Sequence, residues 1–158
     1  MKRIYKHSHI HNNNFEPDTA ILLPVTDEVW GIDYDSEIIV TRHLGNNLHI
    51  IIGIPHLCYG YQRYDVVKVD ENTDLISELI HRARNTSARI IFSKEMDENT
   101  KQRTIDDLIK LNFTVDPYNI NMVGVDLDKE DSREELKIKM NELLAEGLIK
   151  DWEYVIQD

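Results

Sequence analysis

Residues 105–127 read IDDLIKLNFTVDPYNINMVGVDL, and this stretch decides the fold expected for the second half of the chain. Its first apolar residues recur at helical spacing, which predicts a helix that Thr100 can cap. The inner face of this helix consists of Ile105, Leu108 and Ile109. Phe113–Val115 and Met122–Leu127 are β-prone runs, and Asn119–Asn121 between them predicts a turn. We therefore expect a helix followed by a β-hairpin.

The elements on either side of this stretch complete a recognisable order. Arg89–Phe92 predicts a preceding strand, and Trp152–Ile156 predicts a final one. Ser132 and Glu135 match a capping box, in which the serine accepts an amide of the first turn and the glutamate reaches back to the cap. The helix that follows can end at Gly147. The resulting order, β-α-β-β-α-β, predicts a ferredoxin-like module.

A β-hairpin is expected in the first half of the chain. Glu37–Thr41 and Leu48–Ile52 are β-prone and flank Gly45–Asn47, three residues that tolerate the positive φ of a tight turn. Pro55 should stop the second strand, because proline cannot donate to a β-ladder. Val29–Ile32 predicts a short strand before the hairpin.

A strand and a helix are expected to follow the hairpin. Asp65–Val69 alternates between apolar and polar residues, which predicts a strand. Asn72 or Thr73 can then cap a helix. The residues that recur at helical spacing behind this cap are Leu75, Ile76, Leu79, Ile80 and Ala83.

These patterns divide the chain into three parts of an α+β protein. Residues 1–18 are polar and lack a sustained period, so they predict a flexible N-terminal arm. Residues 19–86 predict a small, strongly bent antiparallel β-sheet or barrel-like module with one helix, and residues 87–158 form the ferredoxin-like module. No charge-rich or Pro/Ser-rich linker separates the two modules, so we expect them to pack together.

Composition limits the classes of partner. The 158 residues contain 18 Lys and Arg against 29 Asp and Glu, which gives a net charge of −11. Such a charge repels phosphate backbones, disfavours a nucleic-acid partner and favours a basic one. It is also typical of proteins that are simply soluble. A single cysteine, Cys58, excludes an internal disulfide, and no apolar run suits a signal peptide or a membrane span. We expect a cytoplasmic protein.

A family resemblance lies in the middle of the chain. Residues 53–60 read GIPHLCYG and residues 64–67 read YDVV. This spacing resembles the core of a bacterial domain-of-unknown-function family, number four-two-six-five, and residues 28–30 and 152–154 resemble its opening and closing segments. The resemblance covers about residues 26–156. The residues that carry the family pattern are Trp30, Ile54, Pro55, Gly60, Asp65, Val66 and Val67.

The chain departs from the family pattern at three positions. Gly53 stands where Asn is usual, His56 where Phe is usual, and Tyr64 where Gly is usual. A ligand contact made by the usual Asn or Phe would be lost here. The resemblance implies no enzyme activity and a small accessory protein, for which a role as a toxin-immunity protein is an expectation.

Several histidines and the cysteine raise the question of metal binding or catalysis. Residues 7–11, HSHIH, place three imidazoles on one side of an extended segment, but a loose arm is a poor scaffold for a preorganised site. His43 and His49 should face each other across the hairpin as a surface pair. We expect neither a functional metal nor a cofactor.

The pair His56 and Cys58 permits two interpretations. The imidazole could activate a thiol nucleophile. Alternatively, the cysteine is a small buried hydrophobe, which is the commoner role of this residue. Asp65 precedes a pair of valines and is expected to fix the preceding turn rather than to act as an acid or base.

The functional hypothesis is a non-catalytic cytosolic binding protein. Negative charge concentrates before and within the first turn of the last helix, where it can contact a basic partner such as a toxin, for example a nuclease. The predicted partner-binding residues are Asp126, Asp128, Glu130, Asp131, Glu134 and Glu135. The alternative is a ferredoxin-like sensor of small molecules, for which a homodimer is expected.

Overall fold

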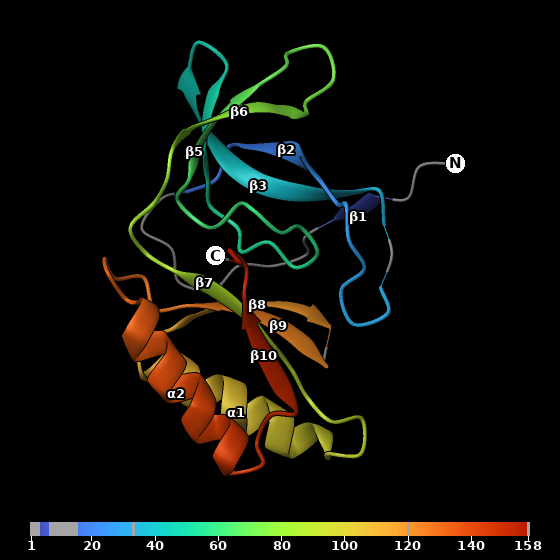
Figure 1. Ribbon diagram of the computed structural model, residues 1–158, viewed down its shortest axis with the longest axis vertical. Helices are drawn as coiled ribbons and strands as arrows, with labels where there is room; N and C mark the ends of the chain where they lie inside the picture. Colours follow the sequence, from blue (N-terminus) through green and yellow to red (C-terminus); the bar gives the residue numbers. More distant parts are fainter. Residues whose placement is uncertain (1–3, 7–15, 33, 120, 158) are drawn as a thin grey trace.

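The computed structural model describes residues 4–6, 16–32, 34–119 and 121–157 and has a mixed α+β fold. The strands and helices of these residues, in chain order, are β1 (Ile4–Lys6), β2 (Thr19–Pro24), β3 (Ser36–Gly45), β4 (Leu48–Ile51), β5 (Val66–Val69), β6 (Ile76–His81), β7 (Ser87–Ile91), α1 (Glu98–Lys110), β8 (Thr114–Asn119), β9 (Met122–Asp126), α2 (Arg133–Ala145) and β10 (Asp151–Tyr154). The elements form three layers: a curled sheet, a second sheet and the two helices (Figure 1).

The first sheet is a curled half-barrel. Its strand order is β1-β3-β4-β5-β6, and β2 also pairs with β3. All these pairs are antiparallel except the one between β1 and β3. The amide of Leu22 donates to the carbonyl of Asp74 at 2.8 Å, which brings β2 towards the start of β6 and partly closes the curl. Inside the curl lie Ile21, Leu23, Ile39, Ile51, Cys58, Val67 and Val69.

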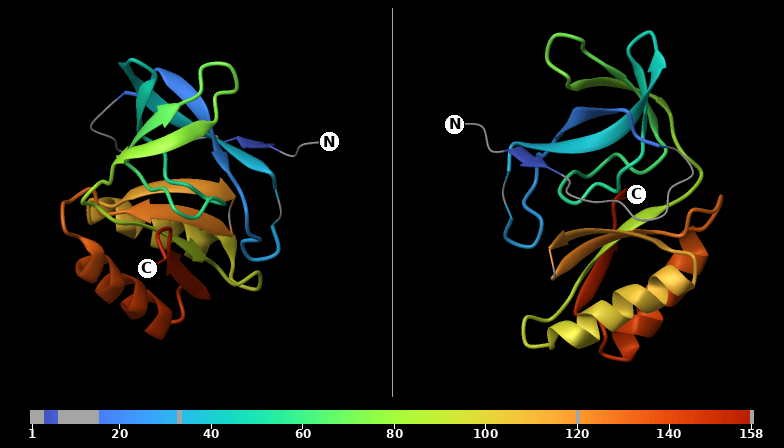
Figure 2. Two further views of the ribbon diagram at one scale, coloured as in Figure 1. Left: turned by 45° about the horizontal axis from the view of Figure 1, so that its top comes forward. Right: turned by 180° about the vertical axis from the view of Figure 1, so that it is seen from behind.

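The second sheet is antiparallel throughout and has the order β10-β7-β9-β8. Both helices cover one of its faces, and its other face is turned towards the first sheet (Figures 1 and 2). Residues of β7, β8 and β9 pack against both helices. The buried residues of this core include Ile90, Phe92, Ile105, Leu108, Val115, Val123, Val125, Leu136 and Met140.

The predicted β-hairpin between residues 37 and 52 is confirmed. β3 and β4 are antiparallel neighbours, and His43 pairs with His49 across them with ring centroids 4.8 Å apart. Asn46 and Asn47 have φ values of 52° and 60°, the left-handed conformation that asparagine tolerates.

The helix predicted behind Asn72 or Thr73 is wrong, because this segment forms strand β6. Register shifts in the pairing of β5 with β6 explain the misleading period. Val69 pairs with Ile76 and Val67 pairs with Leu79, so two residues three positions apart both pack against the core of the curl. A bulged strand can therefore imitate helical spacing.

The predicted strand over Val29–Ile32 is also wrong. Val29 and Ile32 exchange two backbone hydrogen bonds of 2.9 and 3.1 Å, which closes a two-residue turn. The turn residues Trp30 and Gly31 have φ values of 46° and 82°. Two successive positive φ values define a hairpin turn, which a β-prone composition does not reveal.

Two predicted helix caps differ from the structure. The N-cap of α1 is Asp97, whose carboxylate accepts the amide of Thr100 at 2.8 Å. Ser132 precedes α2 but makes no side-chain cap; its hydroxyl accepts the amide of Thr86 at 3.3 Å instead. The serine thus joins the start of α2 to the segment before β7, and the predicted capping box with Glu135 is absent.

Within the predicted N-terminal arm, Ile4–Lys6 form β1 and pair with β3. Residues 1–3 and 7–15, with the three histidines of the HSHIH run, lie outside the described residues. Neither helix of the described residues is long and apolar enough to cross a membrane.

Candidate functional site

The connection between β4 and β5, which contains residues 53–60, lies between the two sheets (Figures 1 and 2). Residues 51–58 are all buried. Ile54 lies against Gly124 of β9, and its amide donates to a carboxylate oxygen of Asp116 at 3.3 Å. A buried loop has backbone groups that need partners, and charged side chains of both sheets supply them.

Glu37 of β3 holds the loop from the side of the curled sheet. This glutamate is fully buried. One of its carboxylate oxygens accepts the amide of His56 at 2.7 Å, and the other accepts the amides of Leu57 and Cys58, each at 3.0 Å. A single carboxylate therefore satisfies three successive buried donors.

Arg89 of β7 holds the same loop from the second sheet. Its guanidinium is fully buried and donates to the carbonyl oxygens of His56 and Cys58. Its Nε lies 3.1 Å from a carboxylate oxygen of Glu153, which also accepts the hydroxyl of Tyr59 at 2.7 Å. The guanidinium carbon lies 4.4 Å from the centre of the Tyr59 ring. Glu37 and Arg89 thus clamp the loop between the sheets.

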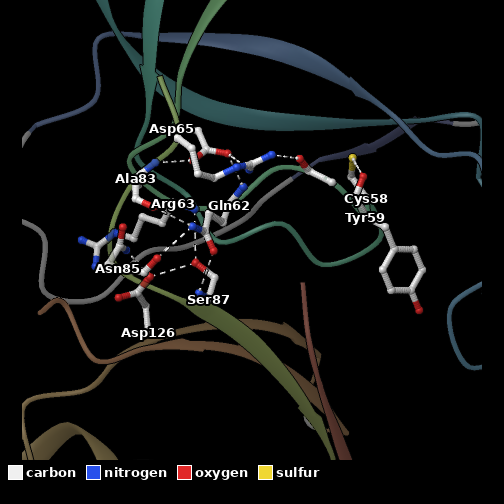
Figure 3. A network of polar contacts seen from close by, with 11 residues as sticks. Cys58, Tyr59, Gln62, Arg63, Asp65, Ala83, Asn85, Ser87 and Asp126 are labelled. Carbon is white, nitrogen blue, oxygen red and sulfur yellow. Dashed lines mark hydrogen bonds and ion pairs between the residues drawn. The ribbon is translucent and has the colours of Figure 1, made fainter. Parts of the chain in front are cut away.

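Asp65 fixes the turn before β5, as predicted from the sequence (Figure 3). Its carboxylate accepts the amides of Gln62 at 3.0 Å and Ala83 at 2.8 Å and is paired with Arg82. The side-chain amide of Gln62 donates to the carbonyl oxygens of Ala83 and Asn85. This network ties the β4–β5 loop to the segment that links the two sheets.

Asp126, at the end of β9, belongs to the same buried network (Figure 3). Its carboxylate accepts the side-chain amide of Asn85 at 2.6 Å, the hydroxyl of Ser87 at 2.8 Å and the amide of Asp128 at 2.6 Å. The Ser87 hydroxyl in turn accepts the amide of Arg63. The role of Asp126 is therefore to accept hydrogen bonds inside the protein.

The stability of the protein should depend on pH through Asp126. Burial raises its pKa to about 6, above the value of about 3.9 of an unfolded aspartate. Between these values the folded state binds more protons, so this contribution is fully present below pH ~4 and is lost as the pH rises through ~6. We expect the unfolding free energy of the wild type, relative to Asp126→Asn, to fall by about 2 kcal/mol between pH 4 and pH 7. Urea unfolding of both proteins at pH 4 and pH 7 measures this difference in unfolding free energy. A difference that is the same at both pH values would contradict the raised pKa of Asp126.

The structure opposes a thiol-nucleophile role for Cys58. The side chain is fully buried, and its thiol lies 3.3 Å from the carbonyl oxygen of Tyr59. Burial, and then the charge of Glu37, raise the pKa of this thiol, whereas a nucleophile needs the thiolate. The Nε2 atom of His56 lies 2.6 Å from the backbone oxygen of Asp116. Both side chains therefore take part in packing the loop.

The six acids of the predicted partner-binding set do not form one surface. Asp126 is buried and so cannot contact a partner, and the side chain of Asp128 is only 13% exposed and lies 3.7 Å from Arg63. The remaining four are exposed and lie before and within the first turn of α2. We call Glu130, Asp131, Glu134 and Glu135 the acidic loop.

Basic side chains neutralise part of the negative charge of the acidic loop. Arg84 pairs with Glu130 at 3.2 Å and with Asp131, and Lys129 pairs with Glu135 at 2.8 Å. Arg133 lies between Asp131 and Glu134 in the chain, so four carboxylates against three cations leave a local charge of −1. Exposed pairs of this kind hold little free energy, so a partner's cation can replace either base.

The sequence did not indicate that Glu37 and Arg89 would clamp the loop. Each is a charged residue beside an apolar run, Glu37 before Ile38–Val40 and Arg89 before Ile90–Phe92. A charge in a β-prone run does not show whether the side chain is buried, since Lys68 of β5 and Glu78 of β6 are exposed.

The fold and this junction define a small α+β protein in which a loop of a curled sheet is clamped onto a second, helix-covered sheet. The chain belongs to the family described as Domain of unknown function (DUF4265), which matches residues 37–151. It is similar to a crystal structure of a hypothetical protein from Neisseria gonorrhoeae, with a TM-score of 0.64 and 13% sequence identity over 89% of this chain and 97% of that chain. This likeness concerns the fold. No curated protein matches the chain.

Proposed function

We propose that this protein binds a basic protein partner and that the acidic loop forms part of the contact. The observation that carries the proposal is the exposure of its carboxylates: the side chains of Glu130, Asp131 and Glu135 are 74%, 68% and 56% exposed. The buried acids Glu37, Asp65 and Asp126, in contrast, accept hydrogen bonds within the fold. The outward carboxylates are therefore the ones open to a partner.

The overall charge supports the same partner chemistry. A net charge of −11 steers a cationic protein towards the surface and speeds association. A toxin that acts on nucleic acid presents a cationic active site, which a carboxylate-rich surface can cover. We therefore extend the proposal to a cytoplasmic immunity protein that neutralises such a toxin.

We also propose that the second module is of the ferredoxin-like type. The supporting observations are the element order β7-α1-β8-β9-α2-β10 and the antiparallel strand order β10-β7-β9-β8. In module numbering this strand order is 4-1-3-2. Both helices lie on one face, which leaves the other face for the clamped loop.

A small-molecule sensor is the alternative function. It is favoured by a cavity of about 480 Å³ beside the segment between β6 and β7. Arg82, Arg84 and Arg133 line it together with Asp131 and Glu134, and the resulting charge of +1 suits a small anionic ligand. Thermal-shift screening with small carboxylates and phosphates tests this alternative, and no stabilisation by any of them counts against it.

Neutralising the acidic loop should weaken partner binding. The variant combines Glu130→Gln, Asp131→Asn and Glu134→Gln, and the partner is first captured from a host lysate at low salt. We expect about tenfold weaker binding of the purified partner, with a smaller salt dependence, because three carboxylates at the contact are lost. Calorimetric titration at two salt concentrations measures the change.

The matched control combines Glu16→Gln, Glu71→Gln and Glu78→Gln, which lie exposed in the first half and change the net charge equally. It should retain the affinity of the wild type. Equal weakening by both variants would show that only the total charge matters. Failure to capture any basic partner would contradict the proposed function itself.

A further inference from the structure

A groove runs along α2 where it meets α1 and the segment that follows α1. A concavity of about 80 Å³ is lined by residues of both helices, and one of about 250 Å³ is lined by α2 together with Leu111, Phe113 and Leu127 from outside the helices; Lys139 lines both of them. Leu111 lines the larger and Asp107 the smaller. The two concavities are therefore neighbouring parts of one groove, which we call the helix seam.

The larger part of the helix seam is apolar and exposed. It is lined by Leu111, Phe113, Leu127 and Ile138. Leu111 and Ile138 are 51% and 61% exposed, and they are two of the five large hydrophobic residues exposed among the described residues. Two such side chains that line one concavity differ from isolated surface apolar residues, which need no explanation.

The charges along the helix seam are mainly negative. Its lining includes four carboxylates and one ammonium, which gives a charge of −3; these residues are Asp107, Glu135, Glu142, Glu146 and Lys139. Lys139 is paired with Glu142 at 3.1 Å. An occupant should therefore carry apolar side chains for the floor and cations for the rim.

The seam continues directly from the acidic loop. Glu135 belongs to both, and the seam then follows α2 as far as Glu146. At 1.5 Å per residue this is a length of about 16 Å, or about three helical turns. A helix laid in an apolar groove is a common recognition mode.

We propose that the helix seam binds a basic amphipathic helix of the partner protein. This inference rests on the proposed function and names the surface that the partner occupies. Apolar residues of that helix pack against Leu111 and Ile138, and its Lys or Arg residues face Asp107, Glu142 and Glu146. The acidic loop attracts the partner, and the seam holds it.

A model peptide tests the proposal independently of any captured protein. The probe is a fluorescent amphipathic helix of leucine and lysine, about 14 residues long, and its control is a scrambled peptide of the same composition. Fluorescence anisotropy should show binding to the full chain, about tenfold weaker binding to Ile138→Ser, and about tenfold weaker binding of the scrambled peptide.

Leu144→Ser is the matched variant, because Leu144 lies on the same helix, is 39% exposed and does not line the seam. It should change the affinity less than about twofold. Equal effects of the two substitutions, equal binding of both peptides, or no binding at all would overturn the helix seam as the docking surface. The proposal would also be overturned if the chain self-associates and Ile138→Ser abolishes this self-association. The occupant of the seam would then be a second copy of the chain.

Failure of this test leaves the proposed function standing if the captured partner still depends on the acidic loop, because Ile138→Ser removes none of the carboxylates of that loop. Failure of both experiments would remove the binding proposal altogether.

Discussion

Replacing Glu37 with alanine is expected to lower the unfolding free energy by about 4 kcal/mol. The carboxylate accepts the amides of His56, Leu57 and Cys58, all of which are buried. Alanine leaves three donors without this acceptor, each at a cost of about 1–3 kcal/mol. Removal of a buried charge offsets part of the loss. Urea unfolding followed by circular dichroism measures the change.

Two further variants keep this prediction decisive. Glu37→Gln preserves one acceptor oxygen and should lower the unfolding free energy by about 2 kcal/mol. This variant therefore tests the role of Glu37 even if the alanine variant does not fold. Glu78→Ala changes an exposed glutamate of β6 in the same sheet and should stay within about 0.5 kcal/mol of the wild type. A loss below about 1 kcal/mol for Glu37→Ala would mean that the clamp is not structural.

The second half of the chain was predictable from its sequence because its signals are local. The helix over residues 98–110 has an amphipathic period, and the hairpin that follows has two apolar runs around an asparagine-rich turn. The element types and their order were therefore correct. The predicted cap of α2 was wrong, because the hydroxyl of Ser132 accepts the amide of Thr86, forty-six residues away in the chain. A local motif cannot reveal such a distant partner.

The error at β6 has a different origin. Its apolar residues fit helical spacing, and only the pairing with β5 shows that bulges shift the register. Ile76 and Leu79 reach the same core by this route. Short apolar runs are compatible with both element types, and here tertiary pairing decides between them.

The candidate site was only partly predictable. The sequence placed Asp65 correctly in a turn, and the structure shows why: two amides and Arg82 surround its carboxylate. The sequence could not show that Asp126 is buried and Glu130 exposed. The two acids are close in the chain, and only the structure shows that β9 ends between the two sheets. Tyr64 has a φ of 72°, a conformation that is uncommon for a residue with a side chain and that the sequence did not reveal.

Gly124→Ala is expected to lower the unfolding free energy by about 3 kcal/mol, although Gly-to-Ala changes within strands are normally favourable. A Cβ at this position would lie 2.6 Å from Cγ2 and 2.9 Å from Cβ of Ile54. Ile54 cannot withdraw easily, since its own amide donates to Asp116 and Pro55 follows it. The clash would therefore push the clamped loop away from the second sheet.

A double-mutant cycle with Ile54→Val or Ile54→Ala tests this mechanism. Each smaller residue destabilises the wild type by leaving space, by about 1 and about 3 kcal/mol respectively. Ile54→Ala removes the Cγ2 atom, so in the Gly124→Ala background it should cost about 2 kcal/mol less than in the wild type. Ile54→Val keeps that contact and should show much less coupling. Additive effects of Ile54→Ala and Gly124→Ala would mean that the two residues do not meet, and the packing of the loop onto β9 would have to be different.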